Sequence, residues 1–163
     1  MTTHEASSQT RPGEGRLSPA LLVGGAFALS TVLSILMHVG QIVFTDADPY
    51  SPSGAVESIV ATSIVGGAGL VLALAIALPL SRDPERARVG AIVLGSLSVV
   101  SLAVFWSGAP AVLGAAAAWL GGLAKGSHPQ TGTARAFGVV GLVIAILVIV
   151  ATMFGGIVGS ISR

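Results

Sequence analysis

The sequence predicts an all-α protein: a polytopic bundle of about five transmembrane helices behind a short polar tail. Three observations predict this class. Hydrophobic residues make up 53% of the 163 residues and charged residues only 9%, whereas soluble domains carry about 25% charged residues. The mean hydropathy is +0.89. The apolar residues also form long runs, and a helix needs about 20 of them to cross a hydrocarbon core. This composition argues against a soluble globular enzyme.

The chain divides into a tail and a membrane domain. Residues 1–16 are polar, contain Pro and Gly, and have no apolar period, which predicts a disordered cytoplasmic tail. The first apolar run is longer than the roughly 7–15 residues of a signal peptide core, so we expect an uncleaved anchor. Each long run should be a helix, because backbone groups in lipid must pair internally. The domain 17–163 is predicted to contain spans at about 17–44, 55–80, 89–106, 108–124 and 136–158.

The segment 108–124 is short for a span, and it leaves two alternatives open. It is either a fifth span, joined to the third by a turn at Ser107–Pro110, or part of one kinked or re-entrant unit over 89–123, which leaves four spans. With five spans, seven of the eight Lys and Arg residues lie on the side of the N-terminus; with four, we expect six against two. Basic residues are retained in the cytoplasm, so the charges favour five spans. We expect a multi-pass protein of the bacterial inner membrane with a cytoplasmic N-terminus.

Small residues recur at a spacing that lets helices approach closely. The chain has 22 Gly residues, and Gly or Ala at positions i and i+4 permits tight packing of helices in lipid. Most of these pairs are expected to pack the protein's own bundle. The best candidate for a face that docks another membrane protein is Gly155/Gly159, at the end of the last helix. The other pairs are Ala91/Gly95, Gly114/Ala118, Ala117/Gly121, Ala118/Gly122 and Gly141/Ala145.

One group of polar residues is a candidate site. His38 and Gln41 lie in the outer part of the first predicted span, and Glu57 lies near the outer start of the second. An antiparallel hairpin brings these positions to similar depths, and ionisable groups inside a membrane call for a functional hypothesis. They would form a proton-sensing or cation-binding site. The alternative is structural: Glu57 suits the positive end of its helix, and His38 bonds a neighbouring helix.

Catalytic and cofactor motifs are missing from the sequence. It has no Cys, no GxSxG, HExxH or Walker A pattern and no basic stripe, so we predict no catalytic residue, metal, cofactor or nucleic acid. The expected partners are the lipid bilayer and either other membrane proteins or a second copy of the chain. The sequence therefore predicts a non-enzymatic accessory or structural partner of membrane proteins. The alternative is a small transporter or channel component with an outer-side polar site.

The C-terminal half carries a family resemblance. From Gly90 onward an apolar helix (AIVLGSLSVVSLAVF) is followed by an SGAP break, a short Gly/Ala helix (AVLGAAAAWLGG), a basic loop and a Gly-rich helix. Over roughly 70 residues this order resembles a Gly/Ala-rich helical domain of unknown function in small bacterial polytopic membrane proteins. His128 and Pro129 in the loop depart from the pattern. The resemblance implies topology only, since the family has no established activity.

Overall fold

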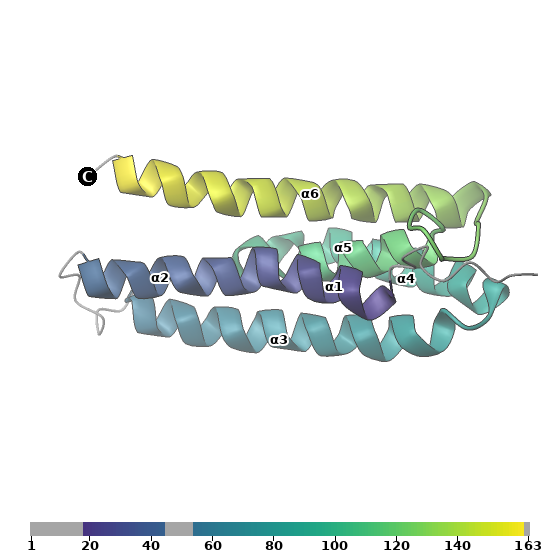
Figure 1. Cartoon of the computed structure of the whole chain (residues 1–163), viewed down its shortest axis with the longest axis horizontal. Coiled ribbons are helices and arrows are strands. Elements are labelled where there is room, and N and C mark those ends of the chain that lie inside the picture. The colour runs from purple at the N-terminus through teal and green to yellow at the C-terminus, as the bar shows by residue number, and fades with distance from the viewer. Residues whose placement is uncertain (1–17, 45–53, 162–163) are drawn as a thin grey trace, which may run out of the picture.

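The computed structural model describes residues 18–44 and 54–161. The predicted tail 1–16 and most of the first predicted loop lie outside this range. Every regular element in the described ranges is a helix: α1 (Pro19–Phe27), a π-helical segment η1 (Ala28–Val32), α2 (Leu33–Phe44), α3 (Ala55–Leu80), α4 (Pro84–Val100), a 3₁₀ segment η2 (Ser101–Ser107), α5 (Ala109–Leu120) and α6 (Gly132–Ile161). Figure 1 shows the long helices lying side by side along one axis.

Four helical stretches are long and apolar enough to cross a membrane. They are Pro19–Gly40, Ala55–Leu80, Pro84–Ser107 and Gly132–Phe154. The first runs unbroken from α1 through η1 into α2, and the third joins α4 to η2. The protein is therefore a multi-pass integral membrane protein with four candidate spans, and the predicted all-α polytopic class is confirmed.

Local signals set where these helices begin. The Ser18 hydroxyl accepts a hydrogen bond from the backbone N–H of Leu21 at 3.1 Å, and Pro19 opens α1. Asp83 does the same for α4, where its carboxylate accepts from the N–H of Glu85 at 2.9 Å ahead of Pro84. Ser, Asp and Pro are the residues that helix starts favour, because they satisfy or lack the unpaired N–H groups there. The sequence thus turns from α3 into α4 within a few residues.

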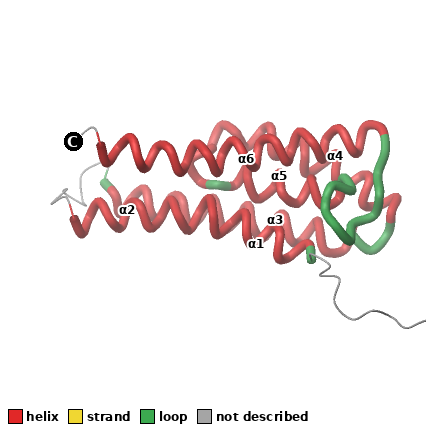
Figure 2. The backbone as a smooth tube through the Cα atoms, turned by 45° about the horizontal axis from the view of Figure 1, so that its top comes forward, coloured by secondary structure: helices red, strands yellow, loops and turns green. Residues whose placement is uncertain are grey.

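The short fifth helix, α5, does not cross the bundle. All twelve of its residues, Ala109–Leu120, are buried, and twelve residues span only about 18 Å. Its first residue, Ala109, lies deep inside the bundle beside Gly69 of α3. Its last residue, Leu120, lies beside Leu80 at the end of α3 and Gly90 near the start of α4. Figure 2 shows the turn before α5 as a short loop between the two ends of the bundle. Of the two alternatives, the structure has four long helices, and α5 folds back beside α4 after a kink in η2.

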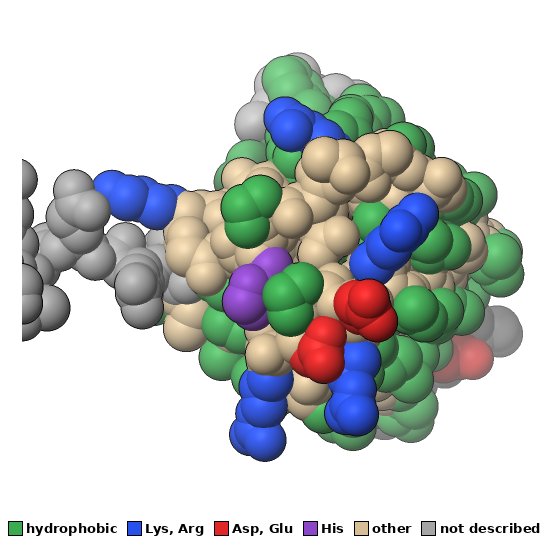
Figure 3. Space-filling model, turned by 90° about the vertical axis from the view of Figure 1, so that its right-hand side faces the viewer, with side chains coloured by type: hydrophobic (Ala, Val, Ile, Leu, Met, Phe, Trp, Pro, Cys, Tyr) green, Lys and Arg blue, Asp and Glu red, His purple; other side chains and the backbone are tan. Residues whose placement is uncertain are grey.

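Both polar connections next to this hairpin lie at the same end of the bundle. The side-chain Nε2 of Gln130, in the connection between α5 and α6, donates to the carbonyl oxygen of Pro84 at the start of α4, at 2.9 Å. Figure 3 views this end, where Lys and Arg side chains gather around two acidic ones. We call it the basic end and define it by Arg82, Arg86, Arg88, Lys125 and Arg135. The six-against-two distribution expected for four spans puts Lys125 and Arg135 on the side opposite the other basic residues. This expectation is wrong, because α5 carries the chain back to the end where α4 begins.

The short helix α5 fits into the bundle because the neighbouring residues are small. A Cβ atom added at Gly114 of α5 would overlap the carbonyl oxygen of Gly141 in α6, and one added at Gly121 would lie 2.7 Å from the Cα of Gly138. Backbones this close need Gly on both helices. Four predicted small-residue pairs lie wholly within this buried core: Ala91/Gly95, Gly114/Ala118, Ala117/Gly121 and Gly141/Ala145. They pack the protein's own bundle, as predicted.

The mid-bundle turn at Ser107–Gly108 is held by buried hydroxyl groups. Thr31 in η1 donates to the carbonyl oxygen of Ser107 at 2.9 Å, and Ser98 in α4 donates to that of Pro110 at 2.9 Å. The Ser107 hydroxyl in turn accepts from the N–H of Ala109 at 3.2 Å. A helix end buried away from water must have its free groups paired in this way. The hydroxyl-bearing residues of η1 and α4 therefore make the half-length helix possible.

Candidate functional site

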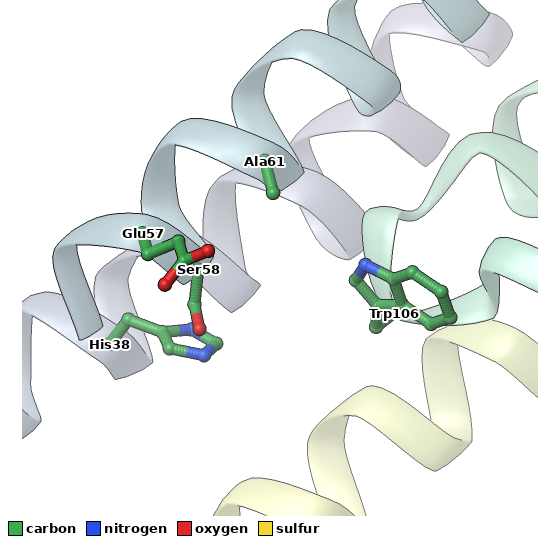
Figure 4. A pocket seen from close by; sticks show the side chains of 5 residues that line it. All are labelled: His38, Glu57, Ser58, Ala61 and Trp106. Carbon is green, nitrogen blue, oxygen red and sulfur yellow. The ribbon is translucent and has the colours of Figure 1, made fainter. Parts of the chain in front are cut away.

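A pocket lies at the opposite end of the bundle, where α5 is absent. We call this the α2/α3 end, because α2 ends there at Phe44 and α3 begins there at Ala55. The pocket has a volume of about 360 Å³ and is lined by His38, Glu57, Ser58, Ala61 and Trp106. Figure 4 shows His38, Glu57 and Ser58 gathered on one side and Trp106 across from them. The pocket thus combines residues from α2, α3 and η2.

Helix α3 supplies three of the lining residues from one face. Residues three and four apart on a helix lie one above the other, so Ala61 shares a face with both Ser58 and Glu57. Glu57 lies in the first turn of α3, where the helix dipole favours a negative charge by about 0.3–1 kcal/mol. Its side chain is exposed, so a solute can reach the carboxylate.

Helix α2 supplies His38, whose orientation is fixed by its own backbone. The Nδ1 atom of the ring lies 2.8 Å from the carbonyl oxygen of Ser34, one turn earlier. A carbonyl oxygen only accepts hydrogen bonds, so we assign the proton to Nδ1. In the neutral ring Nε2 is then an acceptor. His38 therefore offers a lone pair in the pocket and uses its N–H for the helix.

Trp106 reaches the pocket because the helix before it is distorted. Within η2, Val104 leaves the helical region with φ −121° and ψ 40°. Trp106 follows this kink, packs edge-on against Phe105 with ring centroids 5.9 Å apart, and remains 50% exposed. No sequence pattern assigned Trp106 to the site. The only signal was its position just before the SGAP break.

The predicted polar site is brought together in part. His38 and Glu57 line the same pocket, as the hairpin geometry required. The backbone of Gln41 belongs to α2, but its side chain lies outside the described part of the structure. Gly155 and Gly159 lie in the last turns of α6, and their burial is likewise not described.

The described residues contain no group of three or more His, Cys, Asp or Glu side chains that could hold a metal ion. The pocket instead offers one carboxylate, one imidazole, one hydroxyl and one indole ring. This set suits the binding of a small polar or cationic group by hydrogen bonds and charge. The comparisons with known proteins gave no match, whether to a family model, a curated protein or a solved structure, and the family resemblance of the C-terminal half stays a prediction.

Proposed function

We propose that this protein is a non-enzymatic membrane protein that binds a small polar solute in the pocket at the α2/α3 end, as a component of a transporter or channel. One observation carries the proposal: His38, Glu57 and Ser58 line a single hollow in a chain whose charged residues make up only 9% of the total. Ionisable residues in membrane helices are costly to keep and mark solute or ion pathways. A single carboxylate and a single imidazole suit solute binding better than general acid–base catalysis.

The charges support an orientation. The basic end carries Arg82, Arg86, Arg88, Lys125 and Arg135, whereas the described residues at the α2/α3 end include no Lys or Arg. Because Lys and Arg near helix ends are retained in the cytoplasm, we place the basic end there, in the bacterial inner membrane. The pocket then opens toward the outside of the cell.

The sharpest test uses the absence of cysteine in the chain. Ala61→Cys introduces a single thiol in the pocket, and Val60→Cys introduces one at nearly the same depth on another face, where Val60 is exposed but does not line the pocket. A membrane-impermeant thiol reagent added to intact cells should label Ala61→Cys several-fold faster than Val60→Cys. Equal labelling of the two variants, or labelling only after the cells are opened, would contradict a water-filled pocket facing outward.

A second candidate function is the accessory role in a complex of membrane proteins. In α6 no residue from Ile149 to Phe154 is buried, and the predicted Gly155/Gly159 pair follows directly. An apolar stretch of helix that is largely exposed favours lateral association, with another membrane protein or with a second copy.

Crosslinking in native membranes, followed by identification of the crosslinked chains, tests this role. We expect a crosslinked partner that is lost when Gly155 and Gly159 are both replaced by Leu. Replacement of Gly24 and Gly67 by Leu is the matched control, because nothing lies within 4 Å of a Cβ at either position. Recovery of the uncrosslinked chain alone would count against the accessory role.

A further inference from the structure

We propose that the pocket at the α2/α3 end binds a primary ammonium group, with Glu57 as its counter-ion and Trp106 as the aromatic ring against which it packs. The inference rests on the proposed function, because it names the chemistry of the solute for the same pocket. It follows from the acceptors that line the pocket, the distribution of charge along the bundle and the position of the indole ring.

Three of the side chains that line the pocket, those of His38, Glu57 and Ser58, can accept hydrogen bonds, whereas the indole N–H of Trp106 is a donor. The Nδ1–H of His38 is used by the Ser34 carbonyl at 2.8 Å, which leaves the lone pair of Nε2. An ionised carboxylate accepts and does not donate, and a hydroxyl such as that of Ser58 has lone pairs besides its single proton. A primary ammonium group has three N–H donors and no acceptor. Its donors match the acceptors of His38, Glu57 and Ser58.

The charge distribution selects a cation. Among the described residues, the other charged side chains all belong to the basic end or lie beside it: Arg82, Asp83, Glu85, Arg86, Arg88, Lys125 and Arg135. Glu57 is separated from Arg82 by almost the whole of α3, roughly 35 Å at ~1.5 Å per residue. That distance exceeds the Debye length of about 8–10 Å. The described cations therefore do not neutralise Glu57, and a bound cation would.

The aromatic ring completes the site. Trp106 lies across the hollow from the three polar side chains (Figure 4), and its 50% exposure leaves the ring accessible. A cation within about 6 Å of an indole face is attracted by the electron density of the ring. Phe105 packs edge-on against Trp106 at an interplanar angle of 80°.

The same ammonium chemistry has two sources in a membrane. It can come from a small free amine or from the headgroup of phosphatidylethanolamine, which carries a primary ammonium group. The pocket lies at an end of the bundle, near the start of α3, where either source could reach it.

The experiment uses the full chain in phosphatidylcholine nanodiscs, a lipid without a primary ammonium group. Ethanolamine is titrated by calorimetry and by Trp fluorescence, and ethane-1,2-diol serves as a neutral probe of similar size. We expect ethanolamine to bind about tenfold or more tightly than the diol. Glu57→Gln should weaken ethanolamine binding about tenfold to hundredfold, and Trp106→Leu about three- to tenfold. Glu85→Gln, which removes a charge at the basic end, is the matched control and should change nothing.

The outcomes separate the two proposals. Equal binding of ethanolamine and the diol, with no effect of Glu57→Gln, would overturn the ammonium assignment and leave solute binding in place. Tetramethylammonium binding as tightly as ethanolamine would also overturn it, because that cation has no N–H to donate. Failure of every probe to bind would overturn the ammonium assignment alone if Ala61→Cys is still labelled, and both proposals if it is not.

A second nanodisc composition identifies the source. If the natural occupant is a headgroup, phosphatidylethanolamine competes with ethanolamine and raises its apparent dissociation constant relative to phosphatidylcholine nanodiscs. If the occupant is a free amine, ethanolamine binds with the same affinity in both lipids. Either result supports the ammonium site and assigns its source.

Discussion

The two halves of the bundle are built on opposite principles. Between the basic end and the Ser107–Gly108 turn, α5 fills the interior, and each of its residues is buried, with Gly residues of its neighbours at the closest approaches. Between that turn and the α2/α3 end, α5 is absent, and a pocket of about 360 Å³ takes its place. One half therefore carries the tight packing of the fold, and the other has room for a ligand.

The largest effect is expected in the packed half, from Gly114→Ala. The added methyl group would overlap the carbonyl oxygen of Gly141 and lie 3.1 Å from the Ser98 hydroxyl, and a backbone carbonyl cannot move aside. We expect a loss of about 3 kcal/mol in the free energy of unfolding, at the upper end for overpacked cores. Unfolding by SDS in mixed micelles, followed by circular dichroism, measures it. Gly67→Ala is the control, since nothing lies within 4 Å of its Cβ; equal stability of the two variants would show that the close approach is not needed.

The boundary between the halves is tested by a pair of glycines with positive φ. Gly108 has φ 76° and Gly132 has φ 60°, so Ala at either position costs about 1–2 kcal/mol of backbone strain. Only at Gly108 would the Cβ also meet Thr31 Oγ1 at 2.5 Å and Ser30 Oγ at 2.6 Å. We expect Gly108→Ala to lose about 1 kcal/mol more than Gly132→Ala in the same SDS unfolding assay. A smaller loss at Gly108 would mean that η1 and the turn are not in firm contact.

Removing one hydrogen bond at the same boundary should have a smaller effect. Thr31→Val keeps the shape of the side chain but loses the 2.9 Å bond to the Ser107 carbonyl. We expect a cost of about 0.6–1.7 kcal/mol, the range for hydrogen bonds between helices in membranes. Ser63→Ala is the matched control, because the exposed Ser63 hydroxyl bonds only to Ile59 of its own helix. If both variants unfold alike, the bond to the turn contributes nothing to stability.

The smallest effect on stability is expected in the open half. Glu57 and Trp106 are exposed, so Glu57→Gln and Trp106→Leu should change the free energy of unfolding by less than about 0.5 kcal/mol. Their effect should fall on ligand binding instead. A loss of stability comparable to that of Gly114→Ala would show that the pocket lining carries part of the fold, and the contrast between the halves would fail.

The sequence alone predicted those elements whose structure depends on interactions between residues close together in the chain. The length of the apolar runs marked the helices, and the antiparallel hairpin of α2 and α3 brought His38 and Glu57 to one pocket. The start of α4 came five residues earlier than the predicted span, at Pro84, because the cap at Asp83 begins the helix among polar residues.

Non-local contacts explain what the sequence left open. A segment of twelve residues such as Ala109–Leu120 becomes a buried half-helix only because Gly141 and Gly138 of α6 admit its backbone, and no local pattern reveals that pairing. The place of Trp106 depends on the distortion at Val104, and nothing about a valine at this position predicts a distortion. The count of basic residues favoured an arrangement with both basic connections on one side, and the hairpin of α4, η2 and α5 achieves this with four long helices.

The π-helical segment has a consequence for the direction in which His38 points. In η1 the N–H of Leu33 bonds to the carbonyl of Ala28, five residues back, so the segment holds one residue more than an α-helix would place there. Each residue turns an α-helix by about 100°, and the surplus residue resets the angular phase of everything downstream. Val23 lies in α1, before η1, and is packed in the core, whereas His38 lies in α2, after η1. Deletion of a single residue within 28–32 would therefore give a plain α-helix that still points the imidazole toward the pocket. If 28–32 became α-helical with no residue removed, His38 would turn by about 100° away from it.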